Sequence, residues 1–405
     1  MKARIAILSV HTSPLAPLGR RETGGMNVYI RELATDLGKQ GYEIDIFTRR
    51  DDVATPAIVQ MTDNVRAVHI DCGPAGYLEK ELIHQHLGEF EAGVEAFAAG
   101  RRYDIVHSHY WLSGEVGMRL AERWRVPHVT MFHTLAEVKK RARLRQNEPD
   151  ERAVAEHRIA ASATRIVVAS EHERNLLVRL YDANPERVVI APLGVDLDLF
   201  RPLDRSAARR TLGLPDGPII LFVGRIEPLK GLDLLVEAVG QLDEPPTLLV
   251  IGGDERSGGL VSQISARATA LGVESEVRFL GSVQHDRLPL YYSAADVCVV
   301  PSYYESFGLV AVEAMACGTP VVASRVGGLT STVRDGVTGY LIPWRCPEPY
   351  ADMLDTLLAN DELRANLGLA AREVAGEFGW DRVGATMAAL YEELIERQSA
   401  APVPA

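Results

Sequence analysis

Residues 4–10, "RIAILSV", and residues 27–49, "NVYIRELATDLGKQGYEIDIFTR", decide the fold. The first stretch is a short apolar run rich in isoleucine and valine, which favours a buried strand. In the second stretch apolar residues recur at helical spacing as far as Gly41, and "EIDIFTR" then returns to a strand pattern. A strand, a helix and a second strand in this order predict a βαβ unit and a parallel sheet.

The same alternation continues along the rest of the chain. Further strands are predicted at "YDIVHSHY", "PHVTMFHT" and "RIVVASE", and then at "PIILFVGRI", "TLLVIGG", "VRFLG", "VCVVPS" and "TPVVAS". Between these two sets, residues 191–205 ("APLGVDLDLFRPLDR") contain two prolines and three aspartates and follow no clear period. Such a composition is typical of a linker between domains.

We therefore expect an α/β protein with two doubly wound, Rossmann-like domains that face a central cleft. The tail "FGWDRVGATMAALYEELIER" has the pattern of a helix with one apolar face. The expected parts are an N-terminal domain over 1–194, a linker over 195–204, a C-terminal domain over 205–375, and a C-terminal helix over 376–405 that packs back on the first domain.

Composition narrows the possible function. The chain has 405 residues, of which 47% are hydrophobic and 24% charged, and its net charge of -12 argues against nucleic-acid binding. The four cysteines are widely spread and lack CxxC spacing, so we expect reduced thiols and no metal site. No apolar run has membrane-spanning length and no signal peptide is evident, so we expect a cytoplasmic protein without stable membrane insertion. A homodimer is left open.

The loop after the first strand leads through Gly24 and Gly25 into a helix. It contains neither the GxGxxG fingerprint of dinucleotide-binding proteins nor the GxxxxGK[ST] pattern of a P-loop. A glycine pair at a helix N-terminus favours an anionic ligand, because backbone N–H groups and the helix dipole both point toward it. The alternative is that the glycines only turn the chain.

Two further loops follow buried strands in the second half. "FVGRIEPLKG" places Arg225 and Lys230 five residues apart, where two cations could bind a diphosphate; the alternative is a solvated surface pair. "PSYYESFGLVAVEAMACGTPVVAS" places Glu305 and Glu313 eight residues apart around a helix start. Amides at that start could bind a phosphate, and the two carboxylates could accept hydroxyls of a hexose and of a ribose. Alternatively, each glutamate only complements the helix dipole.

These two motifs resemble those of the retaining GT-B glycosyltransferases of family 4. "ESFGLVAVEAMACGTPVVAS" is similar to the E-x7-E motif of that family, and "GRIEPLKG" to its diphosphate-binding loop. The resemblance implies that the C-terminal domain binds a nucleoside-diphosphate sugar, UDP-linked in our prediction, and that no other cofactor and no metal ion is needed for catalysis. The donor-binding residues that it implies are Gly25, Arg225, Lys230, Glu305, Phe307, Gly308, Leu309 and Glu313. The catalytic group comprises Arg225, Lys230, Glu305 and His133.

The motifs of the N-terminal half resemble a narrower group of enzymes within this family. "LSVHTSPLAPLGRRETGGMNVY", "VHSHYWLSGEVG" and "FHTLAEVK" resemble the inositol-phosphate N-acetylglucosaminyltransferases of mycothiol biosynthesis. The resemblance implies that this domain binds a phosphorylated acceptor. The acceptor-binding residues are then His11 and Asn27 for the ring, and Lys80, Tyr110, Thr134 and Arg152 for the phosphate. Other roles stay open for some of them: packing for Tyr110, a helix cap for Thr134, and a structural role for His109 and His133.

Two stretches depart from this pattern. "AEVKKRARLRQNEPDER" is unusually basic, and "EKELIHQ" is closer to sucrose-phosphate synthases and sucrose synthases, which usually have Gln at the position of Met26. We expect retaining transfer of a hexosyl unit, N-acetylglucosamine or glucose, to 1D-myo-inositol 3-phosphate, with fructose 6-phosphate as the alternative acceptor. An epimerase of the same fold and a catalytically silent sugar-nucleotide sensor are the competing hypotheses; the acceptor residues argue against the first, and the retained donor residues against the second.

Overall fold

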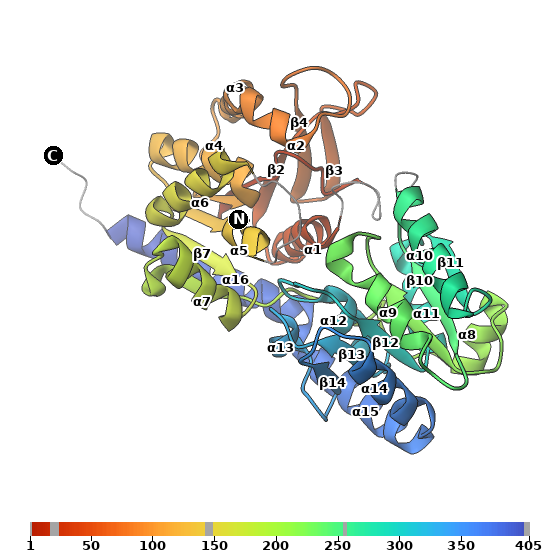
Figure 1. Ribbon diagram of the computed structural model, residues 1–405. Coiled ribbons are helices and arrows are strands. Elements are labelled where there is room, and N and C mark those ends of the chain that lie inside the picture. The colour runs from red at the N-terminus through yellow and green to blue at the C-terminus, as the bar shows by residue number, and fades with distance from the viewer. Residues whose placement is uncertain (1, 17–23, 142–148, 254–256, 401–405) are drawn as a thin grey trace. The chain divides into compact units, whose positions relative to one another are not determined.

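The computed structural model describes residues 2–16, 24–141, 149–253 and 257–400 (Figure 1). Contacts within the chain divide it into two compact units. The first unit contains the described residues up to Pro192 together with those from Trp380 onward, and the second contains Leu193–Gly379.

The first unit is built on an eight-stranded sheet with the order β3-β4-β2-β1-β5-β6-β7-β8. All neighbouring strands are parallel except β3 and β4. The strands are β1 (Arg4–Leu8), β2 (Glu43–Arg49), β3 (Ile58–Thr62), β4 (Val65–Ile70), β5 (Ile105–His109), β6 (His128–Met131), β7 (Arg165–Val168) and β8 (Val188–Ile190). Every strand that the sequence predicted in this unit is present, whereas β3, β4 and β8 were not predicted.

The helices of the first unit follow its strands. They are α1 (Gly25–Lys39), α2 (Lys80–Ile83), α3 (Leu87–Ala98), α4 (Tyr110–Trp124), α5 (Ala136–Arg141), α6 (Asp150–Ser162), α7 (Glu171–Tyr181) and α16 (Trp380–Ala400). In α1 the apolar residues recur on one face, and Tyr29, Ile30 and Leu33 are fully buried against the sheet. This is the βαβ unit that the opening residues predicted.

The second unit contains a six-stranded sheet with the order β11-β10-β9-β12-β13-β14, in which every pairing is parallel. Its strands are β9 (Ile219–Val223), β10 (Thr247–Ile251), β11 (Val277–Gly281), β12 (Val297–Val300), β13 (Val321–Ser324) and β14 (Gly339–Ile342). Its helices are α8 (Arg205–Leu212), α9 (Leu232–Val239), α10 (Gly258–Leu271), α11 (Leu288–Ala294), α12 (Leu309–Ala316), α13 (Leu329–Thr332), α14 (Glu348–Leu358) and α15 (Asp361–Ala375). The first five strands were predicted and β14 was not. Two doubly wound sheets confirm the predicted fold class.

The last helix, α16, belongs to the first unit (Figure 1). It packs so tightly on α1 that a Cβ atom at Gly384 would lie 1.8 Å from a carboxylate oxygen of Asp36. The Tyr42 hydroxyl donates to Glu392 of the same helix at 3.1 Å. The C-terminal helix therefore returns to the first domain, as the sequence predicted.

The predicted linker, 195–204, lies wholly within the second unit. Phe200 is buried there, and its carbonyl oxygen accepts a hydrogen bond from Arg372 at 2.9 Å. Val195 forms an isolated parallel bridge with Gly379, the last residue of the unit. The domain limits predicted from composition stay predictions, and the contacts show which residues of this segment are held in place.

All four cysteines are free thiols. Among the described residues there is no cluster of three or more His, Cys, Asp or Glu side chains that could hold a metal ion. None of the helices in the described part of the chain combines the length and apolar composition that crossing a bilayer requires.

Candidate active site

Arg152 lies at the centre of the acceptor residues predicted in the first unit. It is in the first turn of α6, and only 1% of its surface is exposed. Its Nη2 donates to the Thr134 hydroxyl at 3.0 Å and to the Thr134 carbonyl at 2.7 Å, and its guanidinium carbon lies 4.8 Å from the centre of the Tyr110 ring. Three of the four residues predicted to bind a phosphate are thus in direct contact, although they come from three separate segments.

Tyr110 and His133 have unusual backbone conformations. Their φ angles are 74° and 60°, in the left-handed region that residues other than glycine rarely adopt. Tyr110 follows β5 directly, and His133 lies just beyond β6, so both are at the carboxyl ends of neighbouring strands. Such a conformation costs about 1–3 kcal/mol and is often found at functional sites. This strain supports a role for both residues beyond packing.

A buried glutamate that was not predicted lies next to Arg152. Glu156 is fully buried, and its Oε1 accepts from the Arg152 Nε at 2.7 Å. Its Oε2 accepts from the Ala136 backbone N–H at 2.9 Å and from the Tyr181 hydroxyl. Burial and the Glu156 charge raise the pKa of Tyr181. Glu156 thus neutralises Arg152 and ties α6 to the first turn of α5. The i,i+4 spacing of Arg152 and Glu156 on one predicted helix was the available signal.

The other predicted acceptor residues lie in three further segments. Asn27 is fully buried; its side-chain nitrogen donates to the Thr12 hydroxyl at 2.8 Å and its oxygen accepts from the Gly24 backbone at 3.1 Å. Asn27 therefore ties the loop after β1 to the start of α1, where Gly25 is the first helical residue. The ring of His11 lies 4.6 Å from that of Tyr110. Lys80 is the first residue of α2 and is half-buried, and its place beside an acceptor phosphate stays a prediction.

Behind Tyr110 and His133 lies a group of buried histidines. His109, the last residue of β5, has its Nδ1 2.9 Å from the Nε2 of His133. His107, two residues earlier, has its Nδ1 2.7 Å from the Tyr391 hydroxyl of α16. Burial lowers the pKa of His107 and of His133 to about 3, and that of His109 well below its usual value of 6.5. All three rings are therefore neutral at physiological pH.

In the second unit, Lys230 and Glu305 form an ion pair. The Lys230 Nζ lies 2.6 Å from Glu305 Oε2, and each side chain is about one-fifth exposed. Lys230 ends a short 3₁₀ turn, Pro228–Lys230, and Gly231 follows with a φ of 67°. A Cβ atom at Gly231 would lie 2.2 Å from the Pro301 carbonyl oxygen, so the loop that carries Lys230 packs directly against the end of β12. Two of the four residues predicted as catalytic are therefore in contact.

Arg225 is placed differently. Its side chain is 54% exposed and pairs with Glu227 at 3.1 Å. It lies on the same loop as Lys230, just beyond β9. An exposed arginine side chain can change its rotamer, and the role of Arg225 in holding a diphosphate stays a prediction.

Glu313 is held by two side chains of the same unit. It is buried in α12, its Oε1 lies 3.0 Å from the Nε2 of His285, and its Oε2 accepts from the Tyr292 hydroxyl at 2.8 Å. Burial and the Glu313 charge raise the pKa of Tyr292. Since a carboxylate oxygen can accept more than one hydrogen bond, this carboxylate is oriented and still able to accept hydroxyl groups. His285 and Tyr292 were not predicted, because no local spacing links them to Glu313.

The segment before α12 is fixed by a glycine pair that sequence analysis also missed. Gly308 is the N-cap residue of α12, with Phe307 buried before it and Leu309 as the first helical residue. The backbone of Gly328 donates to the Glu305 carbonyl at 2.8 Å, and a Cβ atom at Gly327 would lie 1.9 Å from the same oxygen. Only glycine permits this approach, so the "VGG" that precedes α13 positions Glu305.

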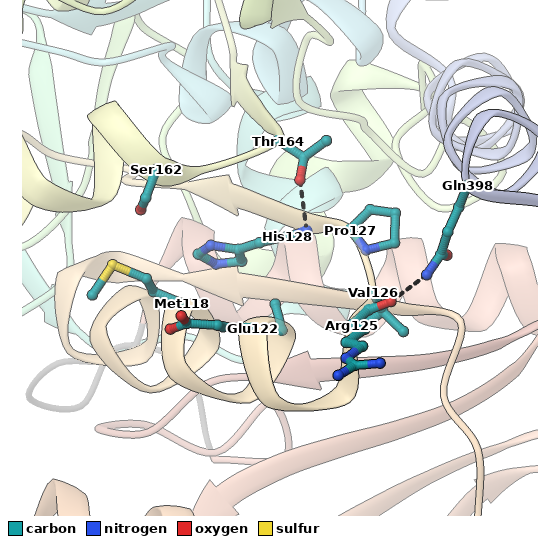
Figure 2. A pocket seen from close by; sticks show the side chains of 10 residues that line it. Met118, Glu122, Arg125, Val126, Pro127, His128, Ser162, Thr164 and Gln398 are labelled. Carbon is teal, nitrogen blue, oxygen red and sulfur yellow. Dashed lines mark hydrogen bonds between the residues drawn. The ribbon is translucent and has the colours of Figure 1, made fainter. Parts of the chain in front are cut away.

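A separate pocket of about 560 Å³ lies at the opposite edge of the first sheet, at the amino ends of β6 and β7 (Figure 2). Its lining includes Arg125, His128 and Thr164, and Gln398 of α16 donates to the Arg125 carbonyl oxygen across it. None of the predicted site residues lines it. Ligands of open parallel sheets bind at the carboxyl ends of strands, so this pocket is not part of the candidate active site.

Comparison with known proteins agrees with this arrangement. The family profile described as "Glycosyl transferase 4-like domain" matches residues 24–194, and that described as "Glycosyl transferases group 1" matches residues 204–374. The structure is similar to that of sucrose-phosphate synthase from Thermosynechococcus elongatus, with a TM-score of 0.92 and 36% identity, covering 98% of this chain and 100% of the other. Together with the two sheets, these matches define the class: a glycosyltransferase of the GT-B fold.

A relative in Xylanimonas cellulosilytica is named D-inositol 3-phosphate glycosyltransferase, and it is 44% identical over 98% of both chains. The chain belongs to this family of glycosyltransferases, as the resemblance of its N-terminal motifs predicted. The fold, but no more than the fold, is also shared with Anabaena HepE in complex with UDP and glucose, at 22% identity and a TM-score of 0.78, covering 97% of this chain and 100% of that one.

Proposed function

We propose that this chain transfers a hexosyl unit, N-acetylglucosamine or glucose, from a UDP-sugar to 1D-myo-inositol 3-phosphate, with retention of the anomeric configuration. The observation that carries the proposal is the contact of Arg152 with Thr134 and Tyr110. A phosphate dianion is best bound by charge-assisted donors from several directions, and these side chains come from separate segments. The relative from Xylanimonas cellulosilytica is named a D-inositol 3-phosphate glycosyltransferase, which supports the same acceptor.

The donor half of the proposal rests on the second unit. Lys230 has three N–H groups, of which one serves Glu305, so the others can bind a diphosphate while Glu305 stays in place. Glu313, held by His285 and Tyr292, is suited to accept the two hydroxyls of a ribose. The presence of UDP in the structures of Anabaena HepE supports a UDP-linked donor.

The proposed chemistry is displacement of the nucleoside diphosphate by an acceptor hydroxyl on the same face of the sugar. Negative charge grows on the leaving phosphate, and Lys230 and Arg225 supply positive charge there. The leaving phosphate takes the acceptor proton. A double displacement would need two close carboxylates on either side of the sugar, whereas Glu305 is engaged with Lys230. Binding of the remote acceptor phosphate by Arg152 orients the attacking hydroxyl.

A second candidate acceptor is fructose 6-phosphate. It is favoured by the similarity to sucrose-phosphate synthase, which is 36% identical to this chain. Both acceptors carry a phosphate, so the same cationic pocket would serve either.

The experiment that tests the proposal is a donor and acceptor panel with product masses as the readout. UDP-N-acetylglucosamine, UDP-glucose and ADP-glucose are each incubated with inositol 3-phosphate, fructose 6-phosphate and free inositol. We expect a product with inositol 3-phosphate and none with free inositol, and Arg152→Ala should raise the acceptor KM without changing the donor KM. Equal use of inositol and its phosphate would refute the phosphate pocket, and a product only with fructose 6-phosphate would establish the second candidate.

A further inference from the structure

His109 and His133 form a hydrogen-bonded pair inside the first unit. The Nδ1 of His109 lies 2.9 Å from the Nε2 of His133, and the ring centres are 5.1 Å apart. Tyr29 packs edge-on against both rings, at 5.6 and 5.7 Å. Neither ring can turn away without displacing this buried tyrosine, so the pair is held as one packed group.

Two neutral imidazoles that share a hydrogen bond contain one proton between the two facing nitrogens. Both rings are neutral, because burial keeps the pKa of each below its usual value. The protonation sites of the two rings are therefore coupled through this hydrogen bond. If His109 donates from Nδ1, then His133 has its proton on Nδ1; if His109 accepts, the proton of His133 is on Nε2.

The surroundings of the other ring nitrogen of His109, Nε2, favour the arrangement in which His109 donates from Nδ1. Its Nε2 is buried and has no hydrogen-bond partner among the described residues. A buried N–H group without a partner is rarer in proteins than a buried acceptor without one. His109 is thus expected to keep Nε2 unprotonated and to donate from Nδ1, which leaves the proton of His133 on its own Nδ1.

We propose that His109 is a positioning residue that fixes the orientation and the tautomer of His133. The catalytic role of His133, which the family resemblance implies, rests on the proposed function; the tautomer assignment does not. His109 contacts neither donor nor acceptor in this proposal and acts only through His133.

His107 and Tyr391 continue the packed group that His109 and His133 form. The His107 ring lies 4.3 Å from that of His109, and its Nδ1 is hydrogen-bonded to the Tyr391 hydroxyl at 2.7 Å. Tyr391 is fully buried on α16. The C-terminal helix thus supports the histidine pair from the side away from the strand ends, so the His109 ring is packed on both sides.

The kinetic test compares two substitutions at position 109. His109→Asn keeps a polar group where Nδ1 was, whereas His109→Leu removes it at similar volume. His109→Leu should lower kcat on the order of tenfold, as loss of an outer partner of a functional histidine does. Both KM values should stay within about threefold, since substrate contacts are unchanged. His109→Asn should recover most of the loss. Equal defects in both variants would overturn the proposal.

A double-mutant cycle separates positioning from a merely structural role. If His109 acts through His133, then His109→Leu has no further effect on kcat once His133 is replaced by Ala. Additive losses would overturn the proposal. The matched control is His128→Leu, because His128 is equally buried on the next strand but bonds to Ser108 at 2.8 Å instead. His128→Leu should change kcat by the same factor whether position 133 is His or Ala.

The last measurement does not depend on catalysis. Ring 15N shifts of histidine-labelled protein distinguish the two neutral tautomers, with His133→Ala used for assignment. Wild-type protein without substrates should show His133 protonated on Nδ1 alone, and His109→Leu should show a mixture. A mixture of His133 tautomers in the wild type would overturn this proposal, even if the chain is active as the proposed transferase. A wild type with His133 protonated on Nδ1 alone but without transferase activity would refute only the proposed function.

Discussion

Acid should destabilise the first unit steeply, because four of its histidines have lowered pKa values and are neutral: His107, His109 and His128 are buried, and His133 is half-buried. Burial lowers the pKa of His107, His128 and His133 to about 3, and that of His109 well below 6.5. In the unfolded chain each imidazole has a pKa near 6.5. Between these values the unfolded state binds protons that the folded state does not, so the free energy of unfolding falls as the pH falls.

The size of this effect follows from the number of protons. Each of these four imidazoles contributes up to about 1.4 kcal/mol per pH unit once the pH is well below 6.5. Glu173 acts in the opposite direction between pH 4.5 and 7, because burial raises its pKa to about 7. The buried His69 and the exposed His172 also have lowered pKa values and add weakly to the loss. On unfolding, the four histidines take up about four protons and Glu173 releases about one, so the net uptake is about three. The free energy of unfolding should therefore fall by about 4 kcal/mol per pH unit between pH 6 and 5.

Urea unfolding followed by tryptophan fluorescence measures this slope. Trp111, Trp124 and Trp380 lie in the first unit and only Trp344 in the second, so the signal reports mainly on the first. The m value is determined at each pH to check that the same surface unfolds. The matched variant His128→Gln removes one buried imidazole and should reduce the slope by about 1.4 kcal/mol per pH unit. An unfolding free energy that is flat from pH 7 to 5, or a variant with the wild-type slope, would refute the reasoning.

Three further predictions concern the two sites. Lys230→Ala should lower kcat about a hundredfold with little change in Tm, because in the proposed reaction Lys230 supplies charge to the leaving phosphate; a near-normal rate would remove Lys230 from the reaction. Glu156→Gln leaves a buried arginine charge uncompensated and should cost on the order of 3 kcal/mol of stability. A phosphorylated acceptor should then raise the Tm of this variant more than that of wild type, and equal shifts would contradict a link between Glu156 and the pocket. Tyr292→Phe removes one donor to Glu313 and should raise the donor KM several-fold while the acceptor KM stays constant, as steady-state kinetics will show.

The main features of the fold were predictable because they are local. Buried parallel strands have continuous apolar runs, and the strands of both sheets that follow this pattern were found from the sequence. The antiparallel pair β3 and β4 was missed because the residues of β3 are exposed or half-buried at the sheet edge and lack a strong pattern. The Asp63-Asn64 turn between them was the available signal for a hairpin.

The site was predictable only in part, because only some of its residues belong to short local motifs. Glu305 and Glu313 share one short motif, and Lys230 lies in another, so the sequence could assign them by resemblance. The residues that hold these groups come from distant parts of the chain. The contact of Tyr181 with Glu156, or of Tyr292 with Glu313, depends on how helices pack, and no spacing in the sequence records it.

The contacts of Arg152 with Glu156 and Thr134 have a physical consequence for the proposed acceptor site. Arg152 enters it with Nε bound to Glu156 and Nη2 bound to Thr134, so its guanidinium is oriented before any phosphate arrives. A long, flexible arginine would otherwise lose about 2 kcal/mol of rotamer entropy on binding. Because that loss occurs during folding, the acceptor phosphate of the proposed reaction would meet a rigid group, and its binding energy would be available to orient the attacking hydroxyl. The buried ion pair is therefore better understood as a positioning device than as a source of stability, since such pairs contribute little net stability by themselves.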